Sequence, residues 1–229
     1  WLLFLLPLLF YVEERHSATE VSEHPICAAY NELRATIREI SKYRNVTIFL
    51  TGYWLYIGGV FTVIFMAVNY GQRLGFEDTD LVMALVISNA IGFPATLLYG
   101  AVAHKFGAMK GIYFALLVYV GACLWGIQMT KVEEFYAMAA VIGLVQGGVQ
   151  GLSRSVYAGL IPQDQPGKFF GFYSMTTKFA YILGPAMVAI AAWLSDDPKW
   201  VLIALMPLFP AGALLLALVR EPEIESNAN

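Results

Sequence analysis

The apolar segment GLVQGGVQGLSRSVYAG, residues 143–159, carries polar side chains at a regular spacing. Gln146, Gln150 and Arg154 recur at every fourth residue, so they share one face of a helix. Amide and guanidinium groups on such a face can hydrogen-bond to a ligand and balance its negative charge. The pattern therefore favours ligand binding. Two simpler explanations stay open, namely snorkelling of Arg154 to the membrane surface and interhelical hydrogen bonds from the two glutamines.

A ridge of small residues adjoins this polar ridge on the same segment. Small side chains let a second helix approach closely where no hydrophobic force drives association. Each four-residue step overshoots a full turn by about 40°, so a partner helix must cross at an angle. The predicted helix-packing residues are Gly143, Gly147, Gly151, Ser155 and Gly159.

A second cation lies in the segment FFGFYSMTTKFAYILGP, residues 169–185. Lys178 is ten residues from Lys168, which places it roughly 15 Å deep at about 1.5 Å per residue, near the middle of a bilayer. Snorkelling from that depth is difficult. Ser174 and Tyr181 share the helix face of Lys178, which again indicates the lining of a polar cavity.

Two further apolar segments contribute candidate ligand-contacting residues. Asn89 lies deep in one of them, and Tyr56 in the other precedes the pair Gly58–Gly59, where we expect a break in the helix. The complete predicted binding set is Gln146, Gln150, Arg154, Lys178, Tyr181, Asn89 and Tyr56.

The acidic residues are absent from all of these segments, so Arg154 and Lys178 have no carboxylate partner within a span. Either another part of the protein supplies that partner, or an anionic or zwitterionic small molecule does. The three histidines, His16, His24 and His104, lie in predicted loops, and no nucleophile with a base, pair of carboxylates or metal cluster is evident. We predict no catalytic residue, metal or cofactor, and a membrane-embedded enzyme is the least favoured class.

Composition places the chain among integral membrane proteins. Of its 229 residues, 59% are hydrophobic and only 14% charged, and the mean hydropathy is +0.63. The net charge of -3 and the scattered basic residues give no indication of a nucleic-acid partner, and we predict none. Six apolar runs, at 47–70, 81–103, 111–130, 135–160, 169–193 and 199–219, are long enough to cross a lipid bilayer. Their short polar connections predict an all-α antiparallel bundle.

Four regions are expected along the chain. Residues 1–12 are predicted to be the end of a truncated transmembrane helix, so we expect the sequence to be a fragment. Residues 47–219 are predicted to form the six-helix bundle. Residues 13–46 form a cytoplasmic linker, and 220–229 a cytoplasmic tail. Within the linker, Leu33, Ile37 and Ile40 recur at helical spacing among basic residues. That pattern favours an amphipathic helix in the headgroup layer over an ordinary solvated helix.

The positive-inside rule orients these spans. Nine Lys and Arg flank one side of the predicted bundle and three flank the other, while Arg154 and Lys178 lie within it. We therefore expect a bacterial-type cytoplasmic membrane, with both ends of the fragment in the cytoplasm.

Several stretches together carry a family resemblance: LRATIREISKYRN, YWLYIGGVFTVIFMAVNYG, GLVQGGVQGLSRSVYAGLIP and FFGFYSMTTKFAYILGP. The chain resembles the C-terminal half of a major facilitator superfamily transporter, in the unknown major facilitator family, which is related to vacuolar amino-acid effluxers. The resemblance implies one half of a twelve-helix fold whose missing N-terminal half is its partner. It also implies a midplane cavity and a secondary transporter of a small anionic or zwitterionic solute, with amino acids as candidates. The alternative is a nontransporting scaffold or sensor on the same fold.

Two departures from the family pattern qualify this expectation. The loop GAVAHKFGAMKG resembles the superfamily's cytoplasmic signature, but His104 and Lys105 stand where Asp and Arg are typical, so the usual charge lock is in doubt. His104 is expected to be an exposed loop residue and not a proton switch. Relatives commonly carry an acid where Gly58 stands, so we expect no proton coupling through this half.

Overall fold

A computed structural model describes residues 25–162, 165–195 and 197–219, without the side chains of residues 25–32 and 104. The predictions for the stub at 1–12, for the tail at 220–229 and for the His104 side chain lie outside these described parts. The chain divides into two units, Trp1–Arg38 and Glu39–Asn229. In the first unit, the amphipathic helix predicted within 13–46 forms most of α2 (Pro25–Ile40), where Arg34, Ile37 and Arg38 are exposed.

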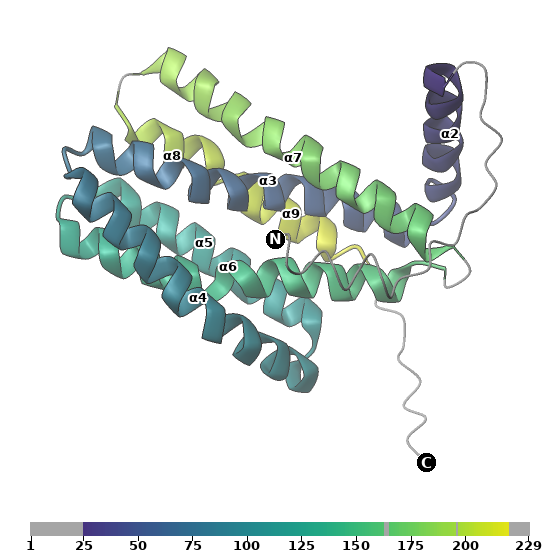
Figure 1. Cartoon of the computed structure of the whole chain (residues 1–229), viewed down its shortest axis with the longest axis horizontal. Coiled ribbons are helices and arrows are strands. Elements are labelled where there is room, and N and C mark those ends of the chain that lie inside the picture. The colour runs from purple at the N-terminus through teal and green to yellow at the C-terminus, as the bar shows by residue number, and fades with distance from the viewer. Residues whose placement is uncertain (1–24, 163–164, 196, 220–229) are drawn as a thin grey trace, which may run out of the picture. The chain divides into compact units, whose positions relative to one another are not determined.

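The second unit consists of helices throughout its described residues (Figure 1). They are α3 (Arg44–Arg73), α4 (Asp78–Phe106), α5 (Ala108–Gln128), α6 (Val132–Leu160), α7 (Pro166–Leu194), α8 (Lys199–Leu205) and α9 (Leu208–Leu216). Six stretches of the described residues are long and apolar enough to cross a membrane, with α8 and α9 together forming the sixth. The prediction of six spans is confirmed, and most of the helices begin or end a turn beyond the predicted limits because their polar ends also stay helical.

Proline and glycine act differently at different places along these helices. Pro94 and Pro185 lie inside the continuous helices α4 and α7, whereas Pro207 separates α8 from α9 because proline has no N–H and its ring clashes with the preceding turn. The expected break at Gly58–Gly59 is wrong, since α3 runs through both residues. Gly58 and Gly59 instead leave room for neighbours. A Cβ at Gly58 would lie 3.1 Å from the Ala180 carbonyl oxygen, and one at Gly59 would lie 3.0 Å from the Phe209 ring.

The helix α3 forms the centre of the second unit. It packs against α7 and α9, while α6 packs against α4 and α5. In the most apolar stretch of each helix, 61% of the residues of α3 are buried, against 17% of those of α4 and of α7. The largest fully buried side chains include Tyr56, Tyr119, Tyr157, Phe49, Phe169 and Phe209. The core therefore lies around α3, and α4 and α7 keep large unpartnered faces.

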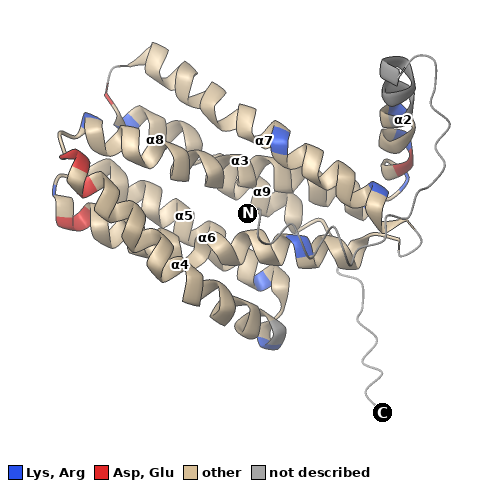
Figure 2. Cartoon of the chain, in the orientation of Figure 1, with Lys and Arg blue, Asp and Glu red and all other residues tan. Residues whose placement is uncertain are grey.

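Most charged residues lie at the two ends of the helices (Figure 2). The acids Glu77, Asp78, Asp80, Glu133 and Glu134 lie where α3, α4 and α6 meet their connections at one end. At the opposite end the described cations are Lys42, Arg44, Lys105, Lys110 and Lys168, with Glu39 among them. The acidic end also carries Arg73, Lys131 and Lys199, so the described cations of this unit number five against three, in the direction that the positive-inside rule predicts. The assignment of the lysine-rich end to the cytoplasm stays a prediction.

Candidate functional site

Aromatic side chains join α3, α6 and α7 in the half of these helices nearer the lysine-rich end. The rings of Tyr53 and Tyr173 stack with centroids 4.5 Å apart, and Tyr157 lies 4.9 Å from Tyr173. The Tyr53 hydroxyl is 3.0 Å from the Thr177 hydroxyl, so a side-chain hydrogen bond links α3 to α7. Such ring pairs contribute about 0.5–1.5 kcal/mol each beyond their burial. The cluster therefore fixes the three helices around one point.

Tyr56 belongs to the inner side of this cluster. Its side chain is fully buried, and its hydroxyl lies 2.7 Å from the Ser153 hydroxyl on α6. Ser153 donates its own proton to the Val149 carbonyl oxygen at 2.5 Å, so Tyr56 is the donor in the pair. In this structure Tyr56 connects α3 to α6 and has no surface that a ligand could reach.

Arg154 follows Ser153 on α6 and is exposed. It lies close enough to Tyr53 and Tyr173 to interact with both electrostatically. The Tyr173 hydroxyl is buried and makes no hydrogen bond within the described residues. No carboxylate pairs with Arg154 in that part of the chain, where the recorded ion pair joins Lys168 to Glu39. Arg154 thus combines an unpaired charge with two nearby phenolic groups.

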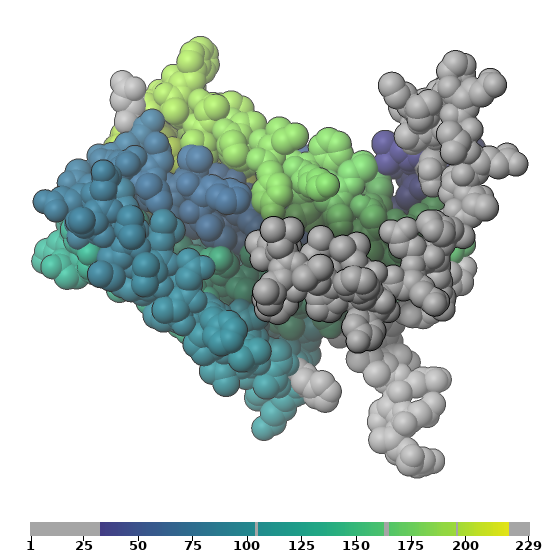
Figure 3. All heavy atoms as spheres, viewed as in Figure 1, coloured from purple at the N-terminus to yellow at the C-terminus, as the bar shows by residue number. Residues whose placement is uncertain are grey.

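Lys178 and Tyr181 lie on the adjoining stretch of α7, and both are exposed. Lys178 follows Thr177, the residue that holds Tyr53, and has no ion-pair partner in the described structure. The Tyr181 ring is 40% exposed and packs against Phe61 and Phe65 of α3, with centroids 4.5 and 6.0 Å apart. The stretch therefore offers a cation beside an aromatic surface. Figure 3 shows a face of the molecule that includes α3, α4 and α7.

The predicted amide side chains lie on α4 and α6. Gln146 and Gln150 are half-buried and make no side-chain hydrogen bond within the described residues. Gln146 lines a cavity of about 50 Å³ with Ser88 and Ile64, between α3, α4 and α6. Asn89 is exposed and donates its amide to the Leu85 carbonyl of its own helix at 2.8 Å, which leaves its oxygen free to accept. These amides keep unused hydrogen-bonding capacity.

The predicted small-residue ridge divides into a packed part and an open part. A Cβ at Gly143 would lie 2.5 Å from the Ser88 carbonyl oxygen, and one at Gly147 would lie 3.0 Å from the Thr96 Cβ. Gly148, which the spacing missed, packs closely against the Tyr99 ring in the same way. By contrast Gly151 and Gly159 meet nothing within 4 Å, and Ser155 is exposed. The ridge thus packs on α4 only near its start, and its open part lies beside Arg154.

The structure groups Arg154 with Tyr53, Tyr173 and Thr177 and places Lys178 next to them along α7. Gln146 and Asn89 lie nearer the acidic end. The predicted binding set lacks Tyr53, Tyr173, Thr177 and Ser153. A helical spacing could have indicated some of them, because Phe49, Tyr53 and Tyr56 follow one face of α3, and Phe170, Tyr173 and Thr177 follow one face of α7.

The all-helical second unit with six membrane-spanning stretches has the architecture of one half of a major facilitator fold. Residues 1–228 match the family described as "Vacuole effluxer Atg22 like". The chain belongs to that family.

Named relatives agree with this assignment. The chain is 33% identical over 221 residues to the "Uncharacterized MFS-type transporter YxiO" of Bacillus subtilis (strain 168), covering 96% of this chain and 51% of that protein. It is 24% identical over 250 residues to "Autophagy-related protein 22" of Yarrowia lipolytica, covering 94% and 42%. The match to "Autophagy-related protein 22-1" of Aspergillus niger is 25% over 206 residues, covering 82% and 34%. The chain thus spans about half the length, or less, of these relatives.

Proposed function

We propose that this chain is the C-terminal half of a secondary transporter that moves small anionic or zwitterionic solutes, amino acids among them, across the cytoplasmic membrane. The observation that carries the proposal is the exposure of Arg154 and Lys178 on α6 and α7 without a carboxylate partner among the described residues. A cation within an apolar span costs about 2.5–3.5 kcal/mol on insertion scales. Such residues are therefore rare, and they usually mark a substrate or ion pathway. The names of the relatives, which include a transporter and a family of effluxers, agree with this function.

The side chains around Arg154 suit the two ends of an amino acid. A guanidinium can hold a carboxylate through two parallel hydrogen bonds, and Arg154 is exposed on α6. The opposite, ammonium end of a zwitterion needs acceptors or ring faces. The Gln150 amide oxygen and the Tyr181 ring supply these on the neighbouring surfaces. Lys178, exposed on α7, adds a second positive group that attracts the carboxylate.

Transport by alternating access would follow from two halves moving about this face. The unpartnered faces of α4 and α7 are the surfaces that an N-terminal half would contact. The hydrogen bonds that Tyr53 and Tyr56 make keep α3, α6 and α7 together. The half would therefore move as one body, while the solute passes between it and its partner.

Solute exchange by the intact protein in proteoliposomes tests this function. Vesicles loaded with an amino acid are diluted into labelled amino acids, organic acids and amines that lack the carboxylate. We expect uptake of the carboxylate-bearing solutes only, and at least tenfold slower uptake by Lys178→Gln, because a hydrogen bond to a charged group contributes about 1.5–3 kcal/mol. Lys199→Gln is the matched control, since Lys199 is an exposed lysine at the acidic end.

Two outcomes contradict the proposal in different ways. No exchange of any amino or organic acid under any imposed gradient would refute transport of this solute class. Saturable binding of a solute or protein without exchange would instead favour the nontransporting scaffold or sensor. Equal uptake by Lys178→Gln and wild type would indicate that Lys178 does not contact the solute and has a structural role.

A further inference from the structure

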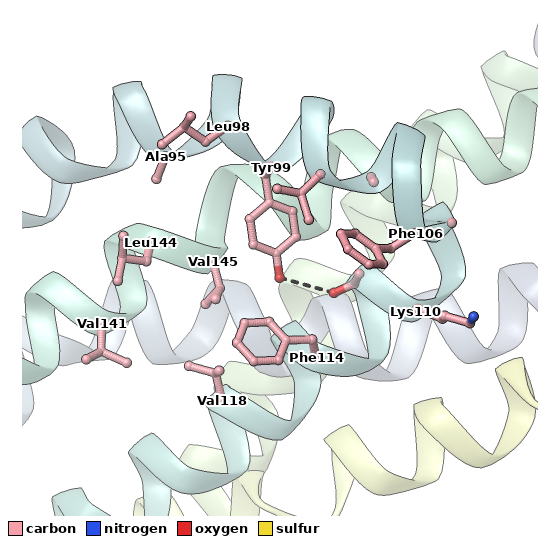
Figure 4. A pocket seen from close by; sticks show the side chains of 14 residues that line it. Ala95, Leu98, Tyr99, Phe106, Lys110, Phe114, Val118, Val141, Leu144 and Val145 are labelled. Carbon is pink, nitrogen blue, oxygen red and sulfur yellow. Dashed lines mark hydrogen bonds between the residues drawn. The ribbon is translucent and has the colours of Figure 1, made fainter.

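A groove lies between α4 and α5, with α6 at its base (Figure 4). Its volume is about 570 Å³. Apolar side chains form most of its wall, among them Leu98 and Phe106 of α4, Phe114 and Val118 of α5, and Leu144 of α6. The Tyr99 hydroxyl, the polar group in its interior, donates to the Gly111 carbonyl oxygen at 3.1 Å. The interior of the groove is thus apolar, and the Tyr99 hydroxyl within it already has a hydrogen-bond acceptor. It contains none of the candidate solute-contacting residues.

The length of the groove matches one leaflet of a membrane. On α4 its wall runs from Ala95 to Phe106, which is roughly 16 Å at about 1.5 Å per residue. Half of a hydrocarbon core of about 30 Å is about 15 Å. The groove therefore reaches from the turn at Gly107 to near the middle of the bilayer. A space of this size equals on the order of 20 water volumes, and such an apolar space next to hydrocarbon fills with hydrocarbon.

The mouth of the groove is positively charged. Lys110 lines it, and Lys105 lies just before the Gly107 turn with its Nζ 5.6 Å from the Phe106 ring centroid. Neither lysine has a carboxylate partner in the described structure. The first turn of α5 contains no acid, whereas α4 and α6 each begin with two. The backbone N–H groups at the start of α5 add to the positive potential.

We propose that this groove binds an anionic phospholipid of the leaflet at the lysine-rich end, with one acyl chain along the groove and the phosphate group at Lys110 and Lys105. Basic pockets between transmembrane helices are suited to anionic headgroups. A second copy of the chain fits less well, because a twofold interface at this groove would bring the same lysines from both copies together. The lipid would hold α4 and α5 apart at this end and stabilise the turn between them.

Lipid titration of the intact purified protein, followed by native mass spectrometry, tests the headgroup. The probes are phosphatidylglycerol and phosphatidylcholine with identical dioleoyl chains. Phosphatidylglycerol is expected to bind more tightly, and Lys110→Gln to weaken it about fivefold, since each basic residue near the surface contributes about 1 kcal/mol. Phosphatidylcholine affinity should not change. Lys42→Gln is the matched control, because Lys42 is an exposed lysine at the same end and outside the groove.

A pair of tryptophan variants tests the acyl chain. Leu97 and Leu98 are both 67% exposed, but only Leu98 lines the groove. Leu98→Trp should fill the groove and reduce binding of both lipids, whereas Leu97→Trp should not. Leu144→Trp, which enters the same groove from α6, provides a second filling variant if Leu98→Trp is poorly folded.

Three results would overturn the proposal. Unchanged phosphatidylglycerol binding in Lys110→Gln would show that the headgroup does not contact Lys110. Unchanged binding in both filling variants would show that no acyl chain occupies the groove. If the wild-type protein is a dimer and Leu98→Trp is a monomer that still binds lipid, a second copy of the chain occupies the groove. Solute exchange is not part of the readout, so these results are independent of the proposed transport.

Discussion

The crossing of α3 and α7 gives the sharpest stability prediction, because no side chain fits between the two helices at Gly184. A Cβ at this position would lie 2.6 Å from the Thr62 Cβ and 2.8 Å from the Gly58 carbonyl oxygen. Thr62 already donates its hydroxyl to that carbonyl at 2.7 Å. Rotation of one side chain cannot relieve the contact with the backbone, so Gly184→Ala must separate the helices. Overpacking costs about 1–3 kcal/mol, and we expect about 2–3 kcal/mol here.

The free energy of unfolding of the intact protein, measured by denaturant titration in mixed micelles, provides the assay. Gly171→Ala on the same helix is the control, because a Cβ there meets nothing within 4 Å. It should change stability by about 0.5–1 kcal/mol at most, and in the stabilising direction, since alanine favours a helix over glycine. Thr62→Ala should restore part of the stability lost in Gly184→Ala by removing the hydroxyl. Equal stabilities of Gly184→Ala and Gly171→Ala would refute the close crossing.

Further predictions concern the contacts of α6. Ser153→Ala should destabilise the protein by about 1–3 kcal/mol, because it leaves the buried Tyr56 hydroxyl without an acceptor, whereas Tyr56→Phe should cost only about 1 kcal/mol. Denaturant titration of both variants checks this order, and a larger loss in Tyr56→Phe would contradict it. Gly148→Ala should lower the unfolding temperature through collision with the Tyr99 ring, while Gly151→Ala, in open space, should not. Equal unfolding temperatures would exclude that packing.

The sequence allowed the six spans to be predicted because each depends on a local property, the length and hydropathy of one segment. Arg154 and Lys178 are exposed in this half of the fold, and their contact with a solute stays a prediction. The burial of the Tyr56 side chain could not be predicted in this way. Its burial depends on Ser153, a partner 97 residues away that supplies the only acceptor recorded for its hydroxyl in the described chain.

The glycines show a second limit of local patterns. A glycine pair such as Gly58–Gly59 can mark either a break or a close approach of helices, and only the positions of Ala180 and Phe209 decide between them. The small ridge of α6 has a related ambiguity. A four-residue repeat winds around its helix, so only its first part faces α4.

The proposed function depends most on whether the surface around Gln150 faces water in the assembled protein, and cysteine labelling measures this directly. Gln150→Cys and Leu144→Cys are introduced on α6 after replacement of the native cysteines, and each lies roughly 15 Å or more from both ends of the helix. A membrane-impermeant thiol reagent should modify Gln150→Cys, more slowly when a transported solute is present, and should leave Leu144→Cys in the lipid-facing groove unmodified. Protection of Gln150→Cys to the same degree as Leu144→Cys, with or without solute, would contradict a water-filled cavity on this face.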